Sequence, residues 1–178
     1  MLQNLNFSQN KNIIKKNLKV DNKKCEEKKM ELLTKTKGKI EVSEERILTI
    51  PEGLFGFAQY TKYALVDCDL EPFIWLQSCE EPNLCFLIVD PFLICSEYEA
   101  DIDDESLAKI NISKPEDIIL MTIVTVPHDG SAITANFQGP LVINKKNKMC
   151  IQAILSDNRW STKVNIVQTL NSKGEKKC

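Results

Sequence analysis

Residues 71–91 of the chain read EPFIWLQSCEEPNLCFLIVDP, and two short apolar runs in this stretch decide the fold. The runs, Phe73–Gln77 and Leu84–Val89, hold aromatic and branched residues on either side of an acidic turn, a pattern that predicts the two strands of a β-hairpin. The first run alternates between two faces, whereas the second is apolar on both, which places it in the middle of a sheet or barrel wall. Pro72 and Pro91 mark the ends, because proline cannot donate to an interior ladder.

Short strand-like runs of the same kind continue on both sides of this hairpin. We expect strands at residues 39–42, 46–50, 63–69, 118–126, 131–137, 141–143, 149–155 and 163–170, with an edge strand at 98–102. Asp103 is a good N-cap for a short helix that carries Asp104 and Glu105 in its first turn. Short strands at regular spacing predict a mainly all-β fold, a small antiparallel β-barrel or sandwich-like domain with one or two short helices.

A glycine-rich loop, PEGLFGF, follows the strand at residues 46–50. Gly53 and Gly56 allow backbone angles that other residues resist, so the loop is expected to be tight. Leu54, Phe55 and Phe57 lie between and after these glycines. Their side chains either tuck under the sheet or stand exposed.

The chain is expected to have three parts: a disordered basic extension over residues 1–34, a β domain over 35–170 and a flexible tail over 171–178. Lysine and asparagine dominate the first part, and its scattered apolar residues hold no helical period. It could be read as a nucleic-acid or membrane arm, but we favour a solvated tail, and Met30 is itself a plausible start. No run approaches the roughly 20 apolar residues of a membrane span, and no secretory signal is present, so we expect a cytoplasmic protein.

Charge is distributed unevenly along the chain. Residues 1–38 carry 10 lysines and 4 acids, a net charge of +6, whereas residues 39–170 carry 10 basic residues and 20 acids, a net charge of −10. Residues 67–117 alone hold 14 acids against two lysines, a net charge of −12. A field of this sign repels nucleic acid and attracts basic partners. We therefore expect a protein partner and no direct contact with nucleic acid or membrane.

The sequence lacks the patterns of catalytic and metal sites. Its one histidine, His128, stands in a turn without a nucleophile elbow, and no phosphate loop or dinucleotide fingerprint occurs. The acid pairs Glu80/Glu81 and Asp103/Asp104 are typical of solvated faces. We expect a non-enzymatic protein without cofactor or metal. The odd number and irregular spacing of the cysteines indicate reduced thiols: Cys25, Cys68, Cys79, Cys85, Cys95, Cys150 and Cys178.

The motifs PEGLFGF, PFIWLQS, VDP and ITANFQGPLVIN, together with Tyr98 and Gln152, resemble the flagellar assembly factor FliW family in order and spacing. The resemblance covers about residues 35–165, and Phe55 stands where the family has proline. It implies a small cytoplasmic β-barrel-like protein without enzymatic activity. It further implies two partners: newly made flagellin, for which such proteins act as chaperones, and CsrA, an RNA-binding translational regulator whose repression of flagellin mRNA they relieve.

Polar residues at strand ends are the candidates for partner contact or turn geometry. They are Gln77, Ser78, Glu80, Asn83 and Asp90, with Tyr98 from the family pattern, Glu81, Asp101, Asp103 and Asp104 from the acidic segment, and the loop residues Gly53, Leu54, Phe55, Gly56 and Phe57. Two other classes of protein stay open. A small-ligand-binding β-barrel would need a deep apolar cavity with a few polar groups, and an enzyme would need a cluster of titrating groups with shifted pKa values in a cleft.

Overall fold

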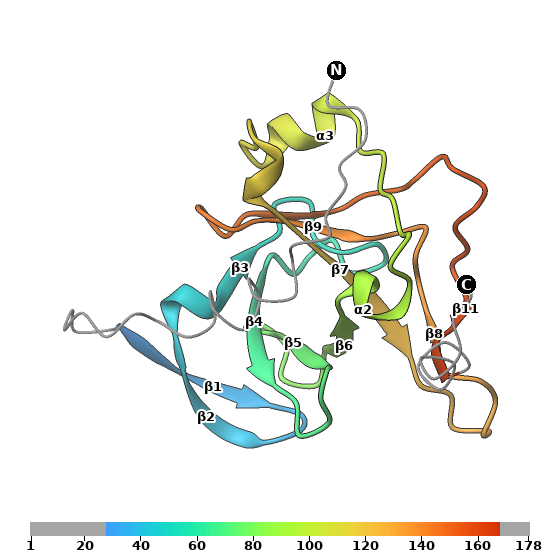
Figure 1. Ribbon diagram of the computed structural model, residues 1–178. Coiled ribbons are helices and arrows are strands. Elements are labelled where there is room, and N and C mark those ends of the chain that lie inside the picture. Colours follow the sequence, from blue (N-terminus) through green and yellow to red (C-terminus); the bar gives the residue numbers. More distant parts are fainter. Residues whose placement is uncertain (1–27, 168–178) are drawn as a thin grey trace.

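The computed structural model describes residues 28–167 and is built mainly of antiparallel strands (Figure 1). The strands are β1 (Lys29–Thr34), β2 (Gly38–Ser43), β3 (Ile47–Thr49), β4 (Lys62–Asp67), β5 (Ile74–Ser78), β6 (Cys85–Val89), β7 (Ile118–Thr125), β8 (Thr134–Ala135), β9 (Leu141–Asn144), β10 (Cys150–Gln152) and β11 (Val164–Asn165). The helices are α2 (Pro91–Ile94) and α3 (Asp104–Lys109), with 3₁₀ turns η2 (Glu44–Arg46) and η3 (Pro115–Asp117). Among the described residues, no helix has the length and apolarity of a membrane-spanning segment.

The predicted hairpin is confirmed as β5 and β6, which pair from Ile74↔Ile88 to Gln77↔Cys85. The main sheet runs in the order β10-β9-β7-β6-β5-β4-β3, so β6 has neighbours on both sides. This position explains why β6 is apolar on both faces. Val89 packs into the core under α2 and α3, and Ile88 packs into the core on the opposite face.

The antiparallel β class is confirmed, but the sheet does not close into a barrel. Between its outer strands, β3 and β10, the structure has one isolated bridge, Thr49↔Met149, and no ladder. The Thr49 amide donates to the Lys148 carbonyl at 2.9 Å across this bridge. The two edges of the sheet therefore meet at this bridge. We call the side of the sheet that carries Leu76, Met121 and Ile143 its concave face.

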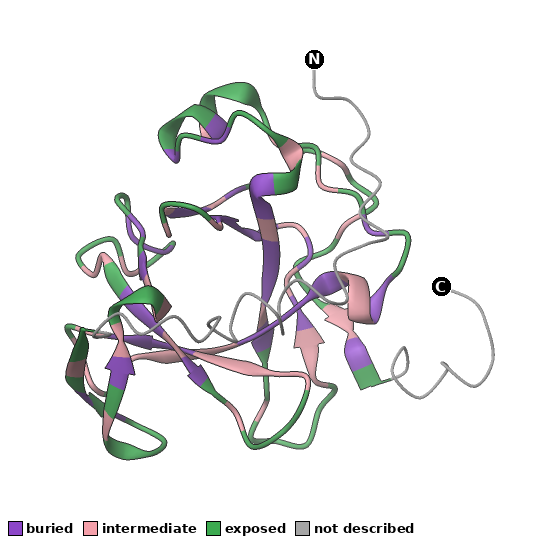
Figure 2. Ribbon diagram, turned by 60° about the vertical axis from the view of Figure 1, so that its left-hand side comes forward, coloured by how far each residue is buried: buried purple, intermediate pink, exposed green. Residues whose placement is uncertain are grey.

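The two faces of the sheet bury separate cores. Buried and half-buried residues make up most of its strands, and exposed residues lie mainly in the loops (Figure 2). Side chains alternate along β7, so Leu120 and Val124 pack with the helices while Met121 packs on the concave face with Leu76 and Ile143. This double burial fixes the register of the strands, because a shift by one residue would exchange the two faces.

The expected start of the β domain at residue 35 is six residues too late. Residues 29–34 form β1, paired with β2 in a hairpin apart from the main sheet. Leu32 and Val42 are buried there and pack against Ala64 and Val66 of β4. The lysines of this stretch place it in the basic extension on composition alone. In the structure only Leu32 and Thr34 of β1 are buried, which is enough to hold the strand against the sheet. Residues 1–27 and 168–178, which include most of the predicted extension and the whole predicted tail, lie outside the described residues.

The segment between α2 and α3 differs from the prediction at one point. Residues 98–102 form no strand, because no described strand pairs with them, and Tyr98 is buried in the core. The helix start is as predicted: Asp103 is the N-cap of α3, and its Oδ1 accepts from the Ser106 amide at 2.7 Å. Asp104 and Glu105 stand in the first turn, where the helix dipole favours acids.

Candidate functional site

Gln77 and Ser78 hold the β5–β6 turn from inside. Gln77 is 1% exposed, and its Nε2 lies 3.0–3.1 Å from the carbonyl oxygens of Ser78, Pro82 and Leu84. Its Oε1 accepts from the Lys35 amide at 3.2 Å, which ties the β1–β2 hairpin to the turn. The Ser78 hydroxyl accepts from two amides of the same turn, those of residues 80 and 81, at 3.1 and 3.0 Å. These two side chains determine the turn geometry and present no surface to a partner.

Asp90 and Tyr98 are also buried. Asp90 caps α2 by accepting from the Phe92 amide at 2.9 Å. The Tyr98 hydroxyl donates to the Phe137 carbonyl at 2.8 Å, and burial raises the pKa of this phenol. The prediction left partner contact and turn geometry open for the strand-end residues; in the structure the side chains of Gln77, Ser78, Asp90 and Tyr98 form hydrogen bonds inside the fold.

The acids of the β5–β6 turn are closer to the surface but bind the backbone. Glu80 is exposed, and its Oε2 accepts from the amides of Thr61 and Lys62 at 2.7 and 3.1 Å. Glu81 is half-buried and accepts from the Asn83 amide at 2.9 Å. The Glu80 carboxylate thus connects this turn to the start of β4, whereas the Glu81 carboxylate binds within the turn, and Asn83 is exposed at its tip.

An acidic surface remains accessible around the start of α3. It consists of six exposed residues with no basic residue between them in the sequence: Glu97, Glu99, Asp101, Asp103, Asp104 and Glu105. One of them is paired, since Arg159 lies 2.9 Å from Glu99. Asp101 and Asp104 form no ion pair with any described residue, whereas Asp103 also caps the helix. The hydrogen bonds from Ser106 hold the pKa of Asp103 below its usual value, so this carboxylate is charged at neutral pH. We call these six residues the α3 acidic surface.

The glycine-rich loop lies next to this surface. Lys109, the last residue of α3, pairs with Glu52 at 3.0 Å, and Figure 1 shows α3 near the loop that joins β3 to β4. Gly53 and Gly56 have φ values of 66° and 83°, and a Cβ on Gly53 would stand 2.5 Å from the Cα of Ala58. The predicted tight loop is confirmed.

The loop divides its apolar residues between core and solvent. Leu54 is buried, and the Phe57 ring meets the Phe86 ring edge-on at 5.3 Å. Phe55 is 58% exposed, and its amide donates to Gln152 Oε1 at 3.0 Å. Proline, the family residue at this position, has no such donor. Ile154, which the sequence analysis did not single out, is 71% exposed two residues after Gln152.

The side chains that could hold a metal ion or act as a nucleophile are dispersed among the described residues. The described residues include no group of three His, Cys, Asp or Glu side chains that could hold a metal ion, and His128 is exposed in its turn. Burial raises the pKa of Cys79 to about 11 and that of Cys85 above its usual value, which disfavours a nucleophilic thiolate. The exposed acids and the exposed phenylalanine suit a protein-contact surface.

Comparison with known proteins gives one consistent result. A sequence model of the FliW protein family matches residues 31–166. The chain is 48% identical over 145 residues to the flagellar assembly factor FliW of Treponema denticola, covering 82% of this chain and 99% of that protein. It is 47% identical over 138 residues to the flagellar assembly factor FliW of Treponema pallidum, covering 78% of this chain and 92% of that protein. The chain also resembles the protein in a crystal structure of the flagellar assembly factor FliW, with a TM-score of 0.71 and 34% sequence identity. The match covers 77% of this chain and 96% of the crystallised chain.

Proposed function

Because the chain belongs to the FliW family of flagellar assembly factors, we propose that it binds newly made flagellin as a chaperone and also binds a CsrA-type translational regulator. The two partners compete for the protein. Free flagellin then occupies it and leaves the regulator on its mRNA, whereas export of flagellin releases it to remove the regulator. In this account the protein works in the cytoplasm, without enzymatic activity and without touching RNA.

The α3 acidic surface supports the regulator as a partner, and it is the observation on which the proposal mainly rests. A regulator that holds RNA presents basic residues, and six exposed acids, of which only Glu99 is paired with a described base (Arg159), supply a complementary field. Such a field steers association and raises the on-rate more than it raises the final affinity. The same field disfavours RNA as a direct ligand.

The exposed apolar residues beside this surface support flagellin as a partner. Phe55 and Ile154 are both more than half exposed, and the Phe55–Gln152 hydrogen bond holds the loop against the chain that leads to Ile154. Large apolar side chains of this kind carry much of the binding energy when an interface buries them. We therefore place flagellin on these two residues and the regulator on the neighbouring acids, close enough for one partner to exclude the other.

The test measures binding of the full chain to purified flagellin and to a CsrA-type regulator, separately and in competition. Phe55→Ser should weaken flagellin binding about 10- to 100-fold, because burying a phenylalanine is worth roughly 1.5–3 kcal/mol. Leu70→Ser is the matched control, since Leu70 is 70% exposed in the loop between β4 and β5. Binding of neither partner, or equal losses in the two variants, would contradict the proposal.

A further inference from the structure

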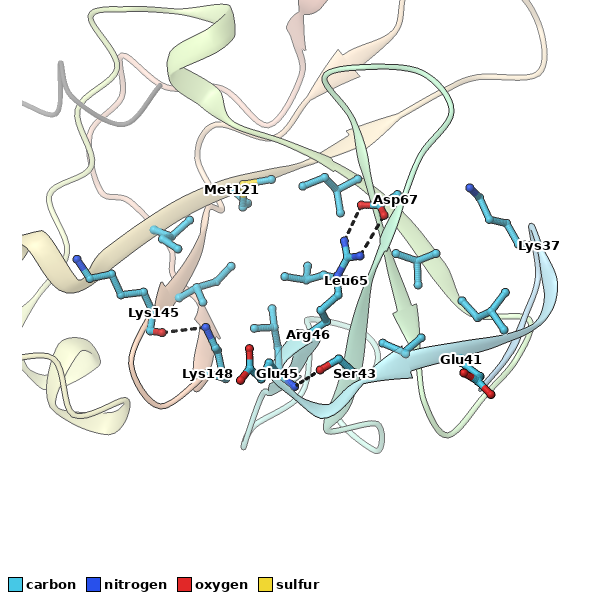
Figure 3. Close-up of a pocket in the computed structure, with 17 residues that line it drawn as sticks. Lys37, Glu41, Ser43, Glu45, Arg46, Leu65, Asp67, Met121, Lys145 and Lys148 are labelled. Atoms are coloured by element: carbon cyan, nitrogen blue, oxygen red, sulfur yellow. Dashed lines mark hydrogen bonds and ion pairs between the residues drawn. The ribbon is translucent and has the colours of Figure 1, made fainter. Parts of the chain in front are cut away.

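The concave face of the sheet opens into a pocket of about 430 Å³ beside the β1–β2 hairpin (Figure 3). Its floor is made of core residues: Leu48, Met121 and Ile143 line it and are at most 4% exposed. Leu65 and Ile119 line it as well and are half-buried. The pocket exists because the sheet does not close, so side chains that a closed barrel would cover face an open space. Its volume lies within the roughly 300–1,000 Å³ of small-molecule sites.

Most charged groups at the pocket mouth already have partners. Arg46 donates to both carboxylate oxygens of Asp67, at 3.0 and 2.6 Å, and Lys37 pairs with Asp69 at 2.9 Å. Lys145 lies 3.8 Å from the buried carboxylate of Asp117. These pairs leave their cations largely neutralised within the protein.

Lys148 differs from these cations. Its ammonium donates to the Lys145 carbonyl at 2.9 Å (Figure 3). No ion pair joins it to a carboxylate of residues 28–167. The side chain is half-buried, so a counter-ion would offset part of its desolvation. Lys148 also has a φ of 60°, a conformation that glycine or asparagine adopts more easily. The turn thus keeps a lysine at the pocket at some cost to the backbone.

We propose that this pocket binds a small amphipathic anion, with an unbranched apolar chain among Leu65, Ile119 and Ile143 and a carboxylate head at the Lys148 ammonium. An apolar chain of medium length matches the volume and the aliphatic floor of the pocket, and a single carboxylate matches the one lysine that lacks a carboxylate partner among the described lining residues. Glu45, the unpaired acid at the same mouth, is exposed to water and therefore does not require a cationic ligand. The site is separate from the α3 acidic surface and does not depend on the proposed partners.

The experiment titrates the full chain with decanoate below its micellar concentration, followed by calorimetry and by methyl NMR signals of Leu65, Ile119 and Ile143. Decylammonium, which has the same chain and the opposite charge, is the ligand control. Leu65→Trp fills the pocket, and Lys148→Gln removes its cation. Lys163→Gln removes an exposed lysine outside the pocket and is the matched control. Thermal unfolding establishes that each variant is folded.

The proposal predicts saturable decanoate binding with shifts at the three methyl-bearing residues, weaker binding of decylammonium, and loss of binding in Leu65→Trp. It predicts at least about fivefold weaker decanoate binding in Lys148→Gln and no change in Lys163→Gln. Three results would overturn it: absence of saturable binding, methyl shifts confined to residues outside the pocket, or equal binding of the two ligands. Methyl shifts that depend on the protein concentration and not on the decanoate concentration would show that a second copy of the chain occupies the pocket. That result would also overturn the proposal. The wild-type NMR titration decides the question even if a variant does not fold.

Discussion

Gln77 offers the sharpest test of the distinction between a turn-forming residue and a partner-contact residue. Gln77→Glu keeps the size of the side chain but replaces Nε2 by an oxygen. That atom would face three carbonyl oxygens that now lie 3.0–3.1 Å from a donor. We expect the domain to remain folded but substantially less stable.

The expected magnitude follows from the bonds that are lost. Each buried acceptor left without a donor costs about 1–3 kcal/mol, and the amide of Gln77 has two hydrogens to give, so the loss should be about 2–6 kcal/mol. The Leu84 carbonyl keeps a donor, the Ser78 amide at 2.9 Å, so the loss falls on the other acceptors. The new carboxyl is disfavoured in its charged form, which raises its pKa above the roughly 4.3 of an unfolded chain. The destabilisation should therefore be largest near neutral pH and should shrink as pH falls through the raised pKa, where the protonated group can donate again.

Urea unfolding of the wild type and the variant over a range of pH measures both the size and the pH dependence. Asn83→Ala is the matched control, because Asn83 is exposed at the tip of the same turn. It should change the free energy of unfolding by less than about 0.5 kcal/mol. The reasoning is refuted if Gln77→Glu is as stable as the wild type but loses a partner, since Gln77 would then act at the surface.

Two further substitutions test buried and paired groups. Tyr98→Phe removes the donor to the Phe137 carbonyl and should cost about 1–3 kcal/mol in urea unfolding, whereas Tyr60→Phe, a half-exposed position, should be near neutral; equal costs would contradict the assigned hydrogen bond. The hydrogen bond from Arg46 lowers the pKa of Asp67 in the folded protein. The stability that this ion pair contributes is therefore complete above a pH of about 3.9, the pKa of an unfolded aspartate, and is lost as pH falls through the lower folded pKa. Asp67→Asn lacks this contribution, so its melting temperature should fall less than that of the wild type as pH decreases. If the two melting temperatures fall in parallel, the pair contributes nothing.

The sequence predicts those parts of the fold that depend on neighbouring residues. The β5–β6 hairpin, the Asp103 cap and the Gly53–Gly56 loop each follow from a local pattern, because strand alternation, capping and positive φ act over a few residues. The strand β1 was missed for a related reason. Its short apolar pattern stands among lysines, and much of the surface that buries Leu32 comes from the distant residues Ala64 and Val66 of β4.

The candidate site was harder to predict because burial depends on distant partners. Nothing local to Tyr98 shows that its hydroxyl meets a carbonyl 39 residues away. The end of β5 likewise does not reveal whether the Gln77 amide turns inward to the hairpin carbonyls or outward to a partner. The acids around α3 were predictable as a group, since charge runs lie at the surface, and Asp101 and Asp104 are indeed exposed. The pocket depends on the incomplete closure of the sheet, which no local pattern encodes.

The central claim is that the α3 acidic surface receives a basic regulator, and association kinetics test it most directly. The variant Asp101→Lys/Asp104→Lys reverses two exposed charges and leaves the Asp103 cap intact. The control Glu44→Lys/Glu45→Lys makes the same change in net charge on η2. Stopped-flow mixing with a CsrA-type regulator at low and physiological salt gives the on-rates of both variants.

The account predicts that reversal beside α3 slows association at least about fivefold at low salt, because steering raises on-rates by 10-fold or more. It also predicts a flatter salt dependence, since screening acts over about 8–10 Å. The η2 control should change the on-rate much less, and flagellin binding should be less affected than regulator binding. An unchanged on-rate in the folded α3 variant, or an equal fall in the η2 control, would contradict the claim.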